Sequence, residues 1–127
     1  ILGCLGYAYW QEQEILNWHI LPTLLLYPIW GLTQQFLIIS LVAGNLEQIE
    51  QPSLPRVLII TITAALFGII HYPHWELIAA TTALALMYGY VFLRWRNLWP
   101  LGLFHGWLGS FFLFYVMGRD AWAEVFL

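Results

Sequence analysis

The chain has no lysine, a single cysteine and very little charge of either sign. Charged residues make up only 9% of the 127 positions, whereas a soluble domain carries about a quarter. That share leaves too little polar side chain to cover a water-facing surface, so a soluble globular protein is excluded. The four arginines are too few to form a basic patch that binds phosphate, and nucleic acid is not an expected partner. The lone Cys4 excludes an internal disulfide and any multi-cysteine metal site.

What the chain has instead is long apolar sequence. Hydrophobic residues make up 61% of it and the mean hydropathy is +0.74. A membrane-spanning helix needs about 20 mostly apolar residues. We predict an all-α, polytopic membrane bundle with four core transmembrane helices and the lipid bilayer as its immediate partner. The predicted spans are 28–46, 56–71, 76–95 and 98–117.

Residues 1–27 read as an N-terminal segment, with a truncated span followed by an interfacial helix that Pro22 interrupts. Because the chain begins at Ile1 within apolar sequence, we expect a further N-terminal portion beyond it. The predicted division is this segment, a core over 28–118 and a tail over 119–127. The loops at 47–56 and 94–97 share one side of the membrane and hold three of the four arginines. The positive-inside rule puts that side in the cytoplasm or its stromal equivalent.

Four polar side chains fall within the predicted spans: Gln34, Gln35, His71 and His105. Polar groups are costly in hydrocarbon and usually face protein or trapped water. We expect these four to converge on one polar pocket, with Gln34 and Gln35 roughly 9 Å inside the boundary marked by Pro28. The alternative for the glutamines is a helix–helix hydrogen bond, and for His71 an interfacial position at a helix end.

A metal site is a weaker interpretation of the same residues. His71 and His74 are three positions apart, but Pro73 interrupts any helical face that they would share. Neutral histidines without a carboxylate or thiolate make a poor zinc site, so no cofactor is expected, with zinc as the alternative. His19 is expected to be a surface or interfacial residue.

Three motifs occur in order on the predicted spans: PIWGLTQQF at 28–36, LFGIIH at 66–71 and NLWPLGLFHGWLG at 97–109. Together they resemble the CPBP family, the CAAX-protease and bacteriocin-processing enzymes also called Abi proteins. The resemblance covers residues 28–118 and implies a glutamic-type intramembrane endopeptidase. The last two motifs are most similar to members from oxygenic phototrophs, which implies a bacterial inner membrane or a thylakoid.

The resemblance also assigns roles to positions. The family has a Glu-Glu pair with an arginine four residues later, then Phe-x-x-x-His, then His-x-x-x-Asn. These positions correspond here to Gln34 and Gln35, Ile39, His71, His105 and Gly109. The mechanism implied is attack of water on a peptide bond, with glutamate as general base, histidine helping to bind the water, and asparagine with histidine stabilising the oxyanion.

The chain departs from that pattern at the general base. A carboxamide oxygen is not basic near neutral pH, so neither Gln34 nor Gln35 removes a proton from water. We therefore expect an impaired protease, or pseudoenzyme, that binds a hydrophobic protein segment in the cleft that would hold the substrate of an active family member. The alternatives are an active endopeptidase in which His71 or another base replaces glutamate, and an accessory or assembly subunit of a larger, photosynthetic membrane complex. The glutamates that remain lie at predicted span ends or in loops: Glu12, Glu14, Glu47, Glu50, Glu76 and Glu124.

Overall fold

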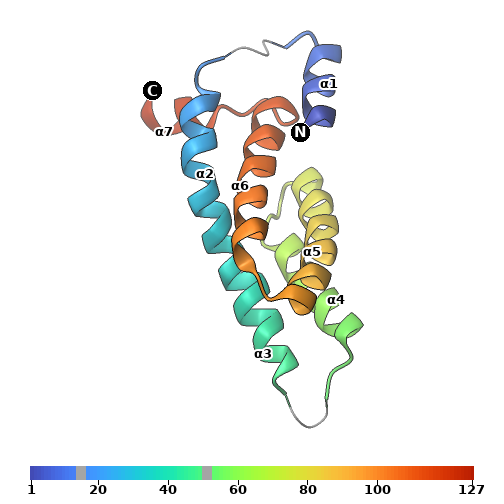
Figure 1. Ribbon diagram of the computed structural model, residues 1–127. Coiled ribbons are helices and arrows are strands. Elements are labelled where there is room, and N and C mark those ends of the chain that lie inside the picture. The colour runs from blue at the N-terminus through green and yellow to red at the C-terminus, as the bar shows by residue number, and fades with distance from the viewer. Residues whose placement is uncertain (14–16, 50–52) are drawn as a thin grey trace. The chain divides into compact units, whose positions relative to one another are not determined.

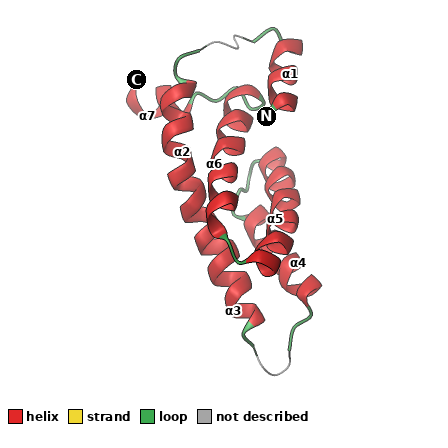
Figure 2. Ribbon diagram, in the orientation of Figure 1, coloured by secondary structure: helices red, strands yellow, loops and turns green. Residues whose placement is uncertain are grey.

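A computed structural model describes residues 1–13, 17–49 and 53–127, and all regular structure in these ranges is helical (Figure 2). The elements in chain order are α1 (Leu2–Trp10), α2 (Ile20–Gln35), the π-helical segment η1 (Phe36–Ala43), α3 (Gly44–Glu47), α4 (Arg56–Ile69), α5 (Trp75–Trp95), α6 (Leu98–Tyr115) and α7 (Ala121–Phe126) (Figure 1). Since α2, η1 and α3 follow one another without a break, they form one long helix. The predicted all-α bundle with four core helices is confirmed.

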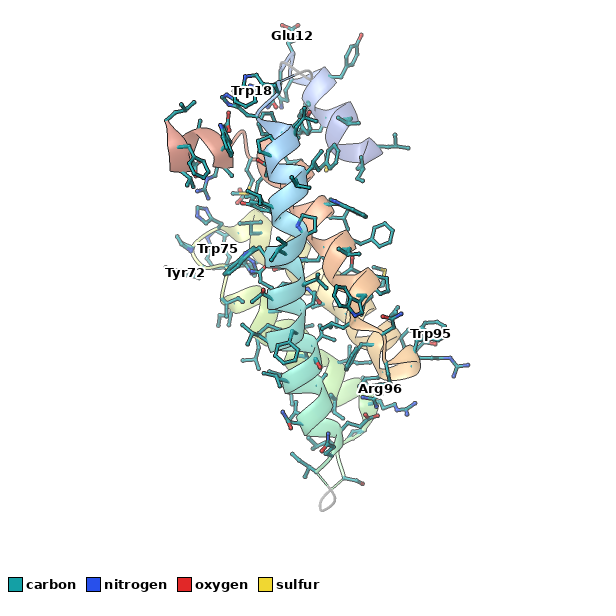
Figure 3. The ribbon with its side chains drawn as sticks, turned by 60° about the vertical axis from the view of Figure 1, so that its left-hand side comes forward. Glu12, Trp18, Tyr72, Trp75, Trp95 and Arg96 are labelled. Carbon is teal, nitrogen blue, oxygen red and sulfur yellow. The ribbon has the colours of Figure 1, made fainter. Side chains whose placement is uncertain are left out.

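Two of the described helices are long and apolar enough to cross a bilayer on their own: Ile20–Glu47, with 28 residues, and α5, with 21. At 1.5 Å per residue α5 is about 31 Å long, which matches the hydrocarbon thickness of a bilayer. Figure 3 shows Tyr72 and Trp75 at one end of α5 and Trp95 at the other, and all three side chains are exposed. Tyrosine and tryptophan favour membrane–water interfaces. The aromatic residues therefore mark the two boundaries of the hydrocarbon layer along α5.

The chain divides into two compact units. The terminal unit comprises Ile1–Leu32 and Gly102–Leu127, and the central unit comprises Thr33–Leu101. The core of the terminal unit forms around Ala8, Ile20 and Tyr115. In the central unit, η1 and helices α4 and α5 bury a larger apolar cluster: Ile39, Ala43, Ile59, Tyr88, Phe92, Leu93 and Leu101.

The prediction that the first span begins at Pro28 is wrong, because α2 begins at Ile20 and runs through this proline. Proline has no backbone N–H, so the carbonyl of Leu24 loses its usual helical donor. The indole N–H of Trp107 donates to that carbonyl instead, at 3.2 Å. An unpaired carbonyl in hydrocarbon would cost several kcal/mol. With this donor supplied the helix continues, and Gln34 lies about 21 Å along it from Ile20 instead of 9 Å from a boundary.

Within the terminal unit, α2 and α6 lie side by side at a seam of small residues (Figure 1). A Cβ added at Gly102 would come within 3.0 Å of the backbone of Leu32, and one at Gly106 within 3.0 Å of the backbone of Pro28. Small residues let membrane helices approach until their backbones touch. At these glycines the two helices are therefore in contact through their main chains, with the side chain of Leu32 also packed against Gly102.

We predict that Gly106→Ala destabilises the protein by about 1–3 kcal/mol, because the new methyl group meets rigid backbone. Gly109→Ala is the matched control on the same helix, since its Cβ would first meet Tyr27 Cδ1 at an ordinary 3.9 Å. Thermal unfolding in detergent micelles compares the two variants. Equal stability of both would contradict a backbone-to-backbone seam.

The C-terminal helix α7 is fastened by one carboxylate. Asp120 accepts a hydrogen bond from the backbone N–H of Ala123 through Oδ1, at 3.0 Å, and so caps α7. Its Oδ2 contacts Nδ1 of His19, 101 positions away in the sequence. The sequence predicted a surface or interfacial position for His19, and the structure shows its side chain partly buried and in contact with Asp120. Partial burial acts to raise the pKa of Asp120, but these two partners outweigh it and hold the pKa below the ordinary 3.8.

Because the pKa of Asp120 is lowered on folding, its contribution to stability is present above pH 3.8 and is lost as the pH falls through the folded-state pKa. We predict that Asp120→Ala makes α7 unfold locally more often at neutral pH, because loss of the cap destabilises the helix by about 1 kcal/mol. Asp120→Asn keeps a good capping group and loses only the ionic contact with His19, so it should release α7 less. Hydrogen exchange at the Ala123 amide measures both. Equal exchange in the two variants would show that the cap contributes nothing, and exchange in Asp120→Asn equal to that in the original chain would show that His19 contributes nothing.

Candidate functional site

The side chain of Gln35 is fully buried, and in the described part of the chain neither its Oε1 nor its Nε2 has a hydrogen-bond partner. Burying an unsatisfied amide costs about 1–3 kcal/mol. Folded proteins keep few such groups, and those they keep call for a specific explanation. Gln35 is therefore the most unusual polar group of the central unit.

The helix changes its hydrogen bonding directly after this residue. Gln35 is the last residue of α2, and Phe36–Ala43 form the π-helical segment η1. Gln35, Ile39 and Ala43 are all fully buried, at intervals of four. In an α-helix each step of four overshoots a full turn by about 40°, so such a stripe would rotate away from the core. The wider π turn reduces that drift, and π segments often occur at functional sites. Nothing in the sequence pattern predicted this segment.

Ile39 occupies the position at which the family resemblance expects an arginine. Its side chain is fully buried within the apolar core of the central unit. Positions four apart on a helix are neighbours, so Gln35 and Ile39 stand where a glutamate and an arginine would pair. A buried charge without its partner is strongly destabilising, whereas replacing both charges is tolerated. Both positions are uncharged in this chain, so neither leaves a buried charge without a partner.

His71 lies in the turn after α4 with its ring held by two neighbours. Its Nδ1 is 2.7 Å from the carbonyl oxygen of Phe67 and 3.3 Å from Oγ1 of Thr81. A carbonyl only accepts, so Nδ1 carries the hydrogen and donates it. The ring also meets Phe67 edge-on, with 5.1 Å between centroids. In the neutral imidazole the lone pair therefore resides on Nε2, which is the nitrogen able to accept a proton.

Within the central unit, Ile38 of η1 packs against the cluster that contains Phe67 of α4. Gln35 directly precedes η1, and His71 lies in the turn that follows α4. That Gln35 and His71 lie close to each other stays a prediction.

His105 and Gly109 belong to α6 in the terminal unit. His105 is 7% exposed, which fits a histidine inside a span. At Gly109 an added Cβ would meet Tyr27 Cδ1 at 3.9 Å, which is an ordinary van der Waals contact. That His105 and Gly109 share a pocket with Gln34, Gln35 and His71 stays a prediction.

Each described carboxylate lies at a helix end, in a loop or in the tail. Glu47 ends α3, Glu76 lies in the first turn of α5, and Glu124 pairs with Arg119 in the tail. Glu14 and Glu50 lie outside the described residues. Among the residues with described placement, no three His, Cys, Asp or Glu side chains are grouped to hold a metal ion.

We predict that Gln35→Met raises the free energy of unfolding by about 1–3 kcal/mol, because it removes an unpaired amide at nearly constant shape. Thr63→Val is the control: Thr63 is equally buried, but its hydroxyl donates to the carbonyl of Ile59 at 2.8 Å. This variant should not gain stability. Chemical unfolding in micelles measures both, and a destabilised Gln35→Met would show that the amide has a partner in the folded protein.

The chain was compared with known protein families. Residues 16–111 match the family described as type II CAAX prenyl endopeptidase Rce1-like. Comparison with curated proteins and with solved structures finds no match. The matched range contains all three motifs and most of the four core helices, so the resemblance drawn from the sequence is confirmed. This chain belongs to the type II CAAX prenyl endopeptidase Rce1-like family of membrane proteins.

Proposed function

We propose that this chain is a proteolytically inactive member of its family that binds a hydrophobic protein segment without cutting it. The observation that carries the proposal is the neutral pair Gln34 and Gln35 at the positions of the general-base glutamates. An amide oxygen does not accept a proton from water at neutral pH. Loss of a general base typically costs about 10²- to 10⁴-fold in rate.

Two further positions support the proposal. Ile39 replaces the expected arginine and Gly109 replaces the expected asparagine. The base, the neighbouring cation and one oxyanion donor are therefore missing together, while His71 and His105 are kept. Joint loss of groups that act in the same reaction fits a site released from catalysis better than a single accidental substitution does.

The glutamines also bring a capability that glutamates lack. A carboxamide both donates and accepts hydrogen bonds, whereas a carboxylate only accepts. A backbone amide group has the same pair of functions, and the buried Oε1 and Nε2 of Gln35 have no partner in the described part of the chain. This favours recognition of the main chain of a bound segment. Such binding suits an accessory role in a larger complex of a bacterial inner membrane or thylakoid.

The second candidate function is an active endopeptidase with His71 as the base. It is favoured by the ring orientation, because Nδ1 is used by Phe67 and Thr81 and leaves Nε2 as the proton acceptor. Under this alternative, cleavage would depend on His71 and not on a carboxylate.

The test restores the family residues in the whole protein, reconstituted in nanodiscs. The restored variant carries Gln34→Glu, Gln35→Glu, Ile39→Arg and Gly109→Asn, so that the new buried carboxylate has a cationic partner. We predict no cleavage of quenched-fluorescent prenylated CAAX or single-span peptides by the original chain. The restored variant should cleave these peptides, about 10²- to 10⁴-fold faster than a variant that keeps both glutamines.

The matched control carries only Ile39→Arg and Gly109→Asn and keeps both glutamines, so any gain over it belongs to the carboxylates. Cleavage by the original chain that is lost in His71→Asn would establish the second candidate function and refute the first.

A further inference from the structure

Three helix ends of the central unit are joined by one carboxylate. Glu47, the last residue of α3, lies between Arg56 at the start of α4 and Arg96 just after α5. Nε of Arg56 is 3.6 Å from Oε1 of Glu47, and Arg96 contacts Oε2. The end of α3, the start of α4 and the end of α5 therefore lie together, as expected if the loops 47–56 and 94–97 share one side.

This end carries most of the positive charge of the protein. Arg56, Arg94 and Arg96 form what we call the arginine cluster, three of the four arginines in the chain. Of the described acidic residues of the central unit, only Glu47 lies here, because Glu76 is in the first turn of α5 at its other end. The side chains of Arg56 and Arg96 are 68% and 46% exposed, so both keep N–H groups open to a ligand. The arginines are too few and too far apart in the sequence to predict a phosphate site, but the fold brings three of them together.

Arg96 adopts a backbone conformation that arginine rarely takes. Its φ is +54°, in the left-handed region, at the position after a helix where glycine is usual. Arg96 is held there by Glu47 and by the ring of Phe92, 5.5 Å from its guanidinium carbon. A strained residue persists only where its surroundings hold it, and such residues gather at functional sites.

The cluster lies at the depth of lipid headgroups. Trp95 and Trp99 flank it and are 63% and 68% exposed, as expected for rings in the interfacial layer. The guanidinium of Arg94 lies 5.9 Å from the ring of Trp95. Figure 3 shows Trp95 and Arg96 together at this end of α5.

We infer that the arginine cluster binds the phosphate of an anionic phospholipid. Guanidinium groups bind phosphate through paired hydrogen bonds, and one carboxylate does not neutralise three of them. The positive-inside rule assigns this end to the cytoplasmic or stromal side, where anionic lipids attract juxtamembrane arginines. The site holds a lipid whose chains lie against α4 and α5, and it is separate from the glutamine–histidine site.

The test uses the whole protein in phosphatidylcholine vesicles that contain a minor share of phosphatidylglycerol. Electron spin resonance of spin-labelled phosphatidylglycerol and phosphatidylcholine measures their relative association with the protein. We predict a preference for phosphatidylglycerol that falls about fivefold in Arg94→Gln and again in Arg96→Gly. Arg96→Gly should fold, because glycine accepts the left-handed conformation without strain.

Arg119→Gln is the matched control: this arginine is exposed but pairs with Glu124, at 2.7 Å, in the terminal unit. It should keep the preference. Equal association of the two lipids with the original protein, or an equal fall in the control, would overturn the proposal. Soluble glycerol phosphate should not displace the labelled lipid at millimolar concentration, and displacement would show a general phosphate site instead of a lipid site.

Discussion

Hydrocarbon offers no hydrogen bonds, and most features of this protein follow from that constraint. Each backbone group in a span must find its partner within the chain. Pro28 breaks this rule locally, and the fold repairs it by directing the indole of Trp107 at the freed carbonyl of Leu24. Serine and threonine hydroxyls in the spans donate to carbonyls of their own helices, as Ser110 does to Gly106 at 2.9 Å. Against this background the unpaired amide of Gln35 is an exception that function has to explain.

The same constraint governs charge at the candidate site. A carboxylate buried in hydrocarbon needs a cation beside it, and the cation needs the carboxylate. Losing only one of the two would leave an uncompensated charge, so a family member that abandons catalysis is expected to lose both. Gln35 and Ile39 are both uncharged, which is what the proposed loss of catalysis requires. The histidines carry no such penalty when neutral, and His71 keeps a defined ring orientation through Phe67 and Thr81.

The sequence was sufficient for features encoded by composition and short spacing. Apolar runs and polar breaks predicted the four core helices, and three short motifs pointed to the family that residues 16–111 match. The sequence could not predict contacts between residues that lie far apart in the chain. Pro28 was taken as a helix start because Trp107, its compensating partner, lies 83 positions after Leu24. The contact of His19 with Asp120 could not be predicted because the two residues are 101 positions apart. The π-helical segment after Gln35 leaves no mark in composition.

The seam between α2 and α6 limits where a hydrophobic molecule can enter the protein laterally from the bilayer. Where an added methyl group would strike main chain on the opposite helix, no lipid tail fits either. These two helices are in direct contact along their glycines, and separating them would leave the carbonyl of Leu24 without its donor, the indole N–H of Trp107. A hydrophobic protein segment that enters from the bilayer would therefore have to pass between other helices, whose contacts are made by deformable side chains.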